Sequence, residues 1–148
     1  MPHITLSNTP GGPIIDGWIG VSESHRVALI QAAKPVPKPV AIRGLIDTGA
    51  SHTCVDPIVV SQLGLTRIGQ CLVDTPSTGK ASATCDQYDI SLVILHPQQK
   101  TAYVKPAMPV ICTELFAKQQ IHALVGRDVL KECLFTYDGA MGIFILAY

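Results

Sequence analysis

Short apolar runs separated by Gly, Pro, Asn and Asp dominate the chain, and several of them alternate between hydrophobic and polar positions. In residues 90–95, Ile90, Leu92 and Ile94 would face one side of an extended chain and form the more apolar set, as in a half-buried strand. We therefore expect strands at residues 4–6, 18–22, 27–31, 40–46, 53–55, 68–74, 88–95, 102–105, 110–112, 122–125, 134–137 and 142–146. This pattern is typical of an all-β sandwich or barrel.

Signals for other elements are few. Pro57–Leu63 predicts a short helix, because Asp56 is a good N-cap and a glycine follows the end. Asp128–Cys133 spaces its apolar residues three or four apart and predicts a second short helix. Lys34–Pro39 alternates proline with other residues, so we expect an exposed connection between two strands. Asp138 precedes a glycine between two apolar runs, which predicts a C-terminal hairpin.

Composition and charge narrow the functional classes. The 148 residues are 47% hydrophobic, with a mean hydropathy of +0.32, which predicts one globular domain over residues 1–148. The 11 basic and 11 acidic residues balance and form no charged run, so nucleic acid and membrane surfaces are poor candidate partners. The N-terminus lacks the pattern of a signal peptide, and a cytoplasmic location is expected.

The cysteines give no sign of special chemistry. There are five, an odd number, at positions 54, 71, 85, 112 and 133, without a Cys-x-x-Cys pair or a histidine at metal-ligand spacing. We interpret them as reduced, mostly buried small hydrophobic residues. No phosphate-binding glycine loop or metal cluster is visible in the sequence, so no cofactor and no metal are expected.

Candidate chemistry centres on Asp47. The apolar run Leu45-Ile46 leads into Asp47-Thr48-Gly49, so a strand would deliver one carboxylate to a corner of the chain. A threonine hydroxyl can hydrogen-bond nearby backbone, and a glycine permits a turn or a close approach that a Cβ would block. An Asp-Thr-Gly tripeptide alone is weak evidence, because these are also ordinary turn residues.

A second segment strengthens the signal. Small residues follow in Ala50-Ser51, and a later apolar run ends in Leu124-Val125-Gly126-Arg127-Asp128. With both segments, the chain resembles the retropepsin-like aspartic proteases, in which one Asp-Thr-Gly-Ala per subunit is followed by a late apolar-apolar-Gly-Arg-Asp or Asn segment. The resemblance covers most of the chain and implies an all-β, retropepsin-like closed barrel of the acid-protease fold, with one or two short helices, that works as a homodimer.

The resemblance also implies roles for individual residues. Asp47 would be catalytic, Arg127 would hold the dimer core together through charge-assisted bonds, and Asp128 would be structural. A glycine-containing flap would close over an extended peptide or protein substrate. The residues implied in substrate binding or loop stabilisation are Thr48, Gly49, Ala50 and Ser51, with Thr75, Pro76, Ser77, Thr78 and Gly79 in a flap that extends to Lys80.

Aspartic proteolysis needs two carboxylates that share a proton, and the chain offers one aspartate in this frame. Asp56 is placed as a helix cap, Asp128 at the head of a helix and Asp138 in a turn. The remaining aspartates lack the apolar-Asp-Thr-Gly frame. A two-fold homodimer that brings Asp47 from each subunit to its axis would solve the deficit, because an isologous interface presents the same residue twice.

Two features depart from the retroviral pattern. Retroviral members usually carry an acid directly after Asp-Thr-Gly-Ala, whereas this chain has Ser51 and then His52, so Arg127 must find another partner. The segment Leu134–Tyr148 is also long enough for a full hairpin. That hairpin could widen a sheet between subunits or lie at an edge within one chain, and the sequence favours neither.

Two alternatives to an aspartic endopeptidase stay open. One is a catalytically inactive retropepsin-like barrel that binds a partner peptide or serves as a dimerisation module. Against it, an inactive module has no need for a pair of desolvated carboxylates, each of which costs several kcal/mol when ionised. The other is a thiol-dependent enzyme, opposed by the lack of a Cys-His arrangement in the sequence and testable by alkylation.

Overall fold

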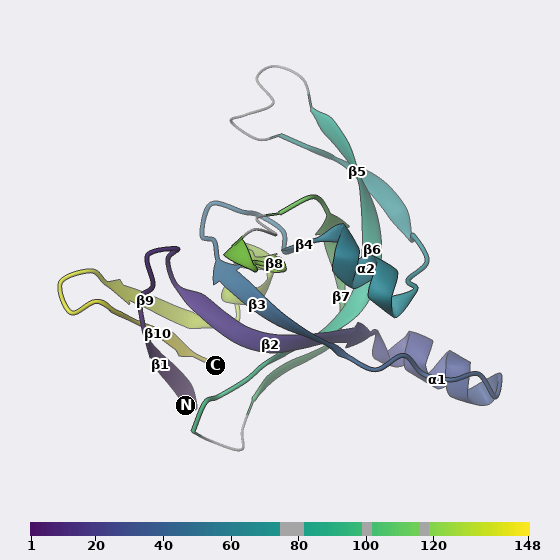
Figure 1. The fold of residues 1–148 in the computed structure, drawn as a ribbon, viewed down its shortest axis with the longest axis horizontal. Coiled ribbons are helices and arrows are strands. Elements are labelled where there is room, and N and C mark those ends of the chain that lie inside the picture. Colours follow the sequence, from purple (N-terminus) through teal and green to yellow (C-terminus); the bar gives the residue numbers. More distant parts are fainter. Residues whose placement is uncertain (75–81, 99–101, 116–118) are drawn as a thin grey trace.

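The computed structural model describes residues 1–74, 82–98, 102–115 and 119–148. Nearly half of them lie in strands, and few lie in helices (Figure 1). The strands are β1 (His3–Ser7), β2 (Ile14–Val21), β3 (Val40–Ile46), β4 (Cys54–Val55), β5 (Gly69–Val73), β6 (Ala83–Ile94), β7 (Tyr103–Cys112), β8 (Ala123–Val125), β9 (Leu134–Asp138) and β10 (Ile143–Ala147). The helices are α1 (Glu23–Gln31), α2 (Pro57–Leu63) and α3 (Arg127–Leu130).

Six strands close into a barrel. Its order is β2-β3-β8-β4-β7-β6, and the antiparallel pairing of β2 with β6 returns to the start. The β3–β8 and β4–β7 pairs are parallel, whereas the other pairs in the ring are antiparallel. The β5 strand pairs with β6 and with no other described strand, and the two strands project from the body of the barrel (Figure 1). The predicted all-β barrel is confirmed.

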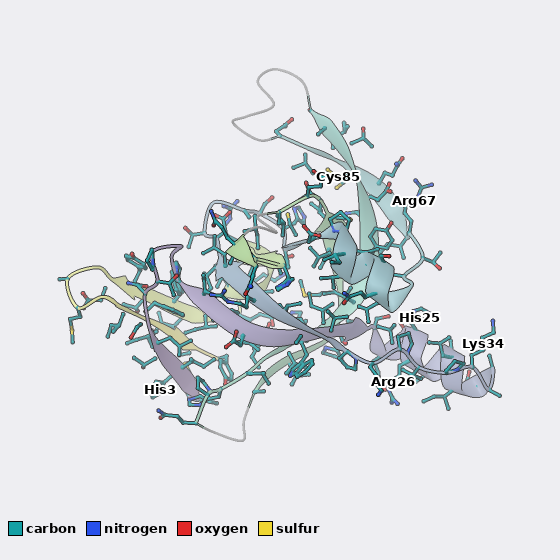
Figure 2. The ribbon with its side chains drawn as sticks, viewed as in Figure 1. His3, His25, Arg26, Lys34, Arg67 and Cys85 are labelled. Carbon is teal, nitrogen blue, oxygen red and sulfur yellow. The ribbon has the colours of Figure 1, made fainter. Side chains whose placement is uncertain are left out.

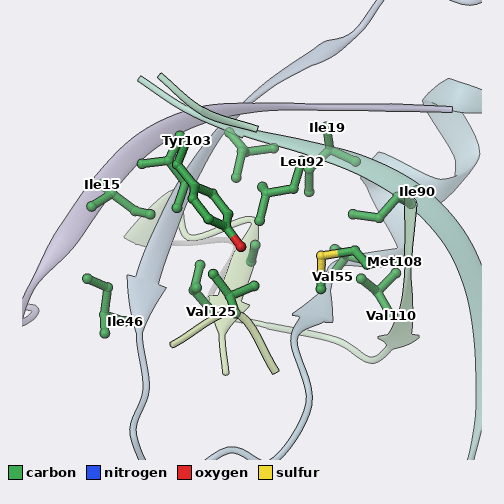
Figure 3. Packing of buried hydrophobic residues seen from close by; sticks show 14 of the residues in the cluster. Ile15, Ile19, Ile46, Val55, Ile90, Leu92, Tyr103, Met108, Val110 and Val125 are labelled. Atoms are coloured by element: carbon green, nitrogen blue, oxygen red, sulfur yellow. The ribbon is translucent and has the colours of Figure 1, made fainter. Parts of the chain in front are cut away.

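The core follows the alternation visible in the sequence. Ile90, Leu92 and Ile94 are fully buried on the inner face of β6, as the pattern predicted. They belong to one buried cluster with Val55 of β4 and Val125 of β8. Figure 3 shows Ile90, Leu92, Val55 and Val125 converging inside the barrel. Burial of branched side chains from strands far apart in sequence is what closes the ring.

The chain ends form a second, three-stranded sheet. Its order is β1-β10-β9, with His3 opposite Ala147 and Ala147 opposite Leu134. Its inward residues Ile4 and Phe144 belong to the same buried cluster as the barrel core. The predicted C-terminal hairpin is therefore confirmed, and within the chain it is covered on one edge by β1.

The strand predicted at residues 27–31 is wrong, because these residues lie in α1. Ser22 caps the helix by accepting a hydrogen bond from the His25 N–H at 3.4 Å, and none of the helical residues is buried. The apolar residues Val27 and Ile30 therefore lie on the surface, where they are 39% and 53% exposed. Hydrophobicity alone does not distinguish a short exposed helix of this kind from a strand. Lys34–Pro39 is largely exposed, as predicted, but it joins this helix to β3.

The other helices agree better with the predictions. The α2 helix begins and ends where predicted, with Asp56 accepting from the Ile58 N–H at 3.0 Å and Gly64 in the left-handed region at φ 58°. The second predicted helix, at 128–133, is shorter, because α3 spans Arg127–Leu130. The described part of the chain holds no helix with the length and hydrophobicity to cross a membrane.

The prediction for β7 is wrong, because two prolines lie inside this strand. We expected separate strands at 102–105 and 110–112, but one strand runs through both, with Pro106 and Pro109 inside it. Within the described residues, β4 pairs with β7 only at Ile111 and Cys112, so no described strand pairs with the other side of residues 103–109, which is a sheet edge. A proline without an N–H is tolerated at such an edge.

Candidate active site

The carboxylate of Asp47 stands where β3 leaves the barrel. The β3 strand pairs in parallel with β8, and directly after it the Asp47 N–H donates to the Val125 carbonyl at 3.0 Å. The chain then turns, and the Ala50 N–H donates to the Asp47 carbonyl at 3.2 Å. A half-buried acid is thus fixed through its own backbone to the neighbouring strand.

Gly49 orients the side chain of Asp47. Its N–H donates to Asp47 Oδ1 at 2.8 Å, the one hydrogen bond that the described residues make to this carboxylate. A Cβ on Gly49 would lie 3.1 Å from the same oxygen, closer than an ordinary contact. Thr48 and Gly49 are exposed, whereas Ala50 is half-buried. The loop therefore holds the acid in place and leaves the adjacent backbone open to a second molecule.

Arg127 contacts this loop within its own chain. Its N–H donates to the Ala50 carbonyl at 2.9 Å, and Nη1 donates to the carbonyls of Thr48 and Gly49 at 2.8 and 3.2 Å. These carbonyls take the place of the acid that retroviral members carry after Asp-Thr-Gly-Ala. The role of Arg127 between subunits stays a prediction, but the structure assigns it partners that the sequence left open.

Asp128 and Thr53 join the segment that follows β8 to the end of the loop that carries Asp47. The Asp128 carboxylate accepts from the Thr53 N–H at 2.8 Å, from Thr53 Oγ1 at 2.7 Å and from the Val129 N–H at 3.0 Å. Thr53 Oγ1 in turn accepts from the Gly126 N–H at 3.1 Å. Sequence reasoning missed Thr53, which is 0% exposed, because a threonine at the start of a strand carries no distinctive signal.

Gly126 allows the segment that follows β8 to pass close to the loop that carries Asp47. A Cβ at this position would lie 2.6 Å from the carbonyl carbon and 2.7 Å from the carbonyl oxygen of His52. Both atoms belong to the backbone, so they cannot swing away as a flexible side chain would. The glycine of the late apolar-Gly-Arg-Asp segment is therefore required by the close approach of the loop that carries Asp47.

The other predicted site residues lie around this centre or outside it. Ser51 and His52 are exposed and contact each other, with 3.0 Å between Oγ and Nδ1. The predicted flap residues Thr75, Pro76, Ser77, Thr78 and Gly79 lie outside the described residues. Two of the other aspartates are engaged elsewhere: Asp56 caps α2, and Asp138 accepts from the Met141 N–H at 2.9 Å in the hairpin turn.

Cys54, which follows the loop of Asp47 in sequence, does not offer a ready nucleophile. All five are free, but they are half-buried rather than mostly buried, which corrects our prediction. Burial is the main cause that raises the pKa of the Cys54 thiol to about 11, and nearby Cys85, Asp128 and Asp47 add to it. A thiol with so high a pKa holds little reactive thiolate near neutral pH.

Among the described residues, no group of three or more His, Cys, Asp or Glu side chains is arranged to hold a metal ion.

Comparisons with known proteins support the fold more than the chemistry. The structure superposes on the crystal structure of a retropepsin-like aspartic protease from Rickettsia conorii with a TM-score of 0.58 at 17% identity, over 99% of this chain and 91% of that chain. No family model matches the sequence. Over 142 residues, 86% of this chain, it is 27% identical to the porphobilinogen deaminase of Corynebacterium diphtheriae, and it spans 42% of the length of that protein. The fold is retropepsin-like.

Proposed function

We propose that this protein is an aspartic endopeptidase whose active site forms between two copies of the chain. The observation that carries the proposal is the placement of Asp47, whose carboxylate is oriented by the Gly49 N–H in a loop that Arg127 clamps through two carbonyls. Rigid positioning of one reactive group by backbone contacts is what a catalytic site requires. We rest the proposal on this geometry, since the sequence similarity covers less than half of the deaminase.

A second copy would supply the missing acid. Each chain contributes one carboxylate in this setting, and a two-fold axis beside the exposed residues Thr48 and Gly49 would bring two Asp47 side chains together. Like charges about 3 Å apart cannot both ionise, so such a pair holds one proton between its members. The ionised member takes a proton from the attacking water, while the protonated member donates to the carbonyl oxygen of the scissile peptide.

The loop backbone would receive the substrate. Thr48 and Gly49 are exposed beside the carboxylate, and a glycine offers an extended peptide close access to the main chain. The Thr48 and Gly49 carbonyls already accept from Arg127, so the guanidinium fixes their direction before a peptide arrives. Polar groups that are already fixed in place lose little conformational entropy when a ligand binds.

The first test compares the wild-type protein with Asp47→Asn on a mixed peptide library, read by mass spectrometry from about pH 3 to about pH 8. The wild type is expected to cleave with a bell-shaped pH dependence, because activity needs one protonated and one ionised acid. Asp47→Asn is expected to lose cleavage and to keep its fold, since the asparagine amide oxygen can still accept from the Gly49 N–H. Asp16→Asn, the same change at an exposed acid on β2, is the matched control and should cleave normally.

Other outcomes would redirect the proposal. Cleavage that survives Asp47→Asn would exclude Asp47 as the catalytic acid. A folded, dimeric wild type that cuts no peptide would favour the inactive barrel that binds a peptide or serves as a dimerisation module. Loss of the dimer in Asp47→Asn would make the residue structural.

A further inference from the structure

Two cysteines face each other across the projecting β5–β6 hairpin. Cys71 on β5 is the direct antiparallel partner of Cys85 on β6. Figure 2 labels Cys85 on this hairpin, beyond the closed part of the barrel. Directly opposed residues in an antiparallel pair have Cα atoms about 4.5 to 5.5 Å apart. A disulfide needs a Cα separation of about 4.4 to 6.8 Å, so the backbone already meets the requirement.

Both thiols lie on the same face of the hairpin. Direct partners across a ladder point the same way, and Cys71 and Cys85 are both half-buried. The neighbouring residue Leu72 points to the opposite face and is 72% exposed. Burial, followed by the influence of Cys85, raises the pKa of the Cys71 thiol. The two sulfur atoms are therefore near each other and neither is shut off from solvent.

Polar contacts fix the register on both sides of the pair. Between the cysteines and the barrel, Asp86 Oδ1 accepts from Gln70 Nε2 at 2.8 Å and from Arg67 Nη1 at 3.2 Å. On the other side, Ser82 Oγ donates to Asp74 Oδ1 at 2.5 Å. A one-residue slip would turn one thiol to the opposite face, so these contacts keep the two cysteines opposed.

We propose that Cys71 and Cys85 form a reversible intramolecular disulfide when the protein meets a peroxide. One thiolate attacks hydrogen peroxide, the O–O bond breaks, and the products are a sulfenic acid and a hydroxide, which takes a proton from the solvent to become water. The second thiol then attacks the sulfenic sulfur, the S–S bond forms, and the hydroxyl leaves as a second water after taking the thiol proton. Two sulfur atoms are oxidised and one peroxide is reduced, and a dithiol reverses the bond by exchange.

The sequence provides a clean readout. Trypsin cleaves after Arg67, Lys80 and Lys100, so Cys71 falls in peptide 68–80 and Cys85 in peptide 81–100. The other three cysteines fall in peptides 44–67, 101–118 and 132–148, because Lys105 precedes a proline and resists cleavage. Each possible disulfide would thus join a different pair of peptides.

The experiment treats dilute wild-type protein with hydrogen peroxide, blocks the remaining thiols with N-ethylmaleimide under denaturing conditions and maps the tryptic peptides. Peptides 68–80 and 81–100 are expected to appear joined and two hydrogens lighter than their sum, and the labelled cysteines should fall from five to three. Dithiothreitol should restore all five. The reaction should accelerate from about pH 6 to about pH 8, because the thiolate is the attacking species.

Matched variants locate the bond. Cys71→Ser and Cys85→Ser should each lose the joined peptides, whereas Cys133→Ser, in the turn that follows α3, should keep them. The proposal is overturned if both peptides carry the maleimide after peroxide treatment, if Cys85 is joined to Cys54 or Cys112, or if the joined peptides occur only in covalent dimers. The wild-type map needs no variant to fold and is independent of peptidase activity.

Discussion

At Gly126 the segment that follows β8 lies against the backbone of the loop that carries Asp47. We expect Gly126→Ala to lower the free energy of unfolding by about 1–3 kcal/mol, because the new Cβ would press on the backbone of His52. Urea denaturation measures this loss. Peptide cleavage should fall as well, since the displaced segment belongs to the loop that carries Asp47.

Gly139→Ala is the control for that prediction. Its added Cβ would lie 3.5 Å from a ring carbon of Tyr137, an ordinary contact in the hairpin turn. An unstrained Gly→Ala change stabilises a protein, because it lowers the conformational entropy of the unfolded chain. Equal losses of stability in the two variants would therefore show that the close approach to His52 is not what makes Gly126→Ala destabilising.

The sequence singles out Asp47 as the candidate acid but does not reveal the residues that surround it. Asp47 and Gly49 stand in a recognisable frame, and the structure places them in contact. The partners of Arg127 were out of reach, because they are main-chain carbonyls, which every residue possesses. Thr53 was missed for a related reason, since its role comes from complete burial between two segments distant in sequence.

Among the elements, α2 depends on its N-cap Asp56, whose carboxylate accepts two separate hydrogen bonds. Asp56 Oδ1 accepts from the Ile58 N–H, while Oδ2 accepts from the Leu115 N–H at 3.0 Å, so the buried carboxylate joins the helix to the chain after β7. Asp56→Ala should lower the free energy of unfolding by about 1–3 kcal/mol, because two partly buried N–H groups lose their acceptor.

Asp56→Ser separates the contribution of the helix cap from that of the hydrogen bond to Leu115. A serine hydroxyl restores the cap but is too short to serve Leu115 as well, so thermal or urea unfolding should place this variant between wild type and Asp56→Ala. A serine variant as stable as the wild type would mean that the bond to Leu115 contributes nothing.

Element prediction succeeded where hydrophobicity and burial agree. Ile90, Leu92 and Ile94 alternate in sequence and are buried in the structure. It failed at α1, where Val27 and Ile30 are apolar but exposed, so the pattern carried no information about a sheet. It also failed at Pro106 and Pro109, because only the pairing of β4 determines which part of β7 is an edge.

For the whole molecule, the decisive question is whether the site needs two chains. Wild type refolded together with a threefold excess of Asp47→Asn should keep about one quarter of its peptide cleavage, because random pairing leaves few dimers with two intact acids. Cleavage of the library peptides measures this directly.

The same mixture made with Asp16→Asn should cleave at the summed activity of its components, since that acid lies on the outside of β2. Wild-type activity that is unchanged by excess Asp47→Asn would show that a single chain suffices. It would then require a second acid that neither the motif nor the contacts of Asp47 indicate.

The pairing of β1 with β10 has a consequence for how the chain is made. Residues 3–7 pair with residues 143–147, so β1 leaves the ribosome long before the strand that pairs with it has been made. Contacts between such distant positions form slowly, because a long loop must close first. Until then Ile4, which is fully buried in the finished protein, stays exposed to any chaperone or neighbouring nascent chain.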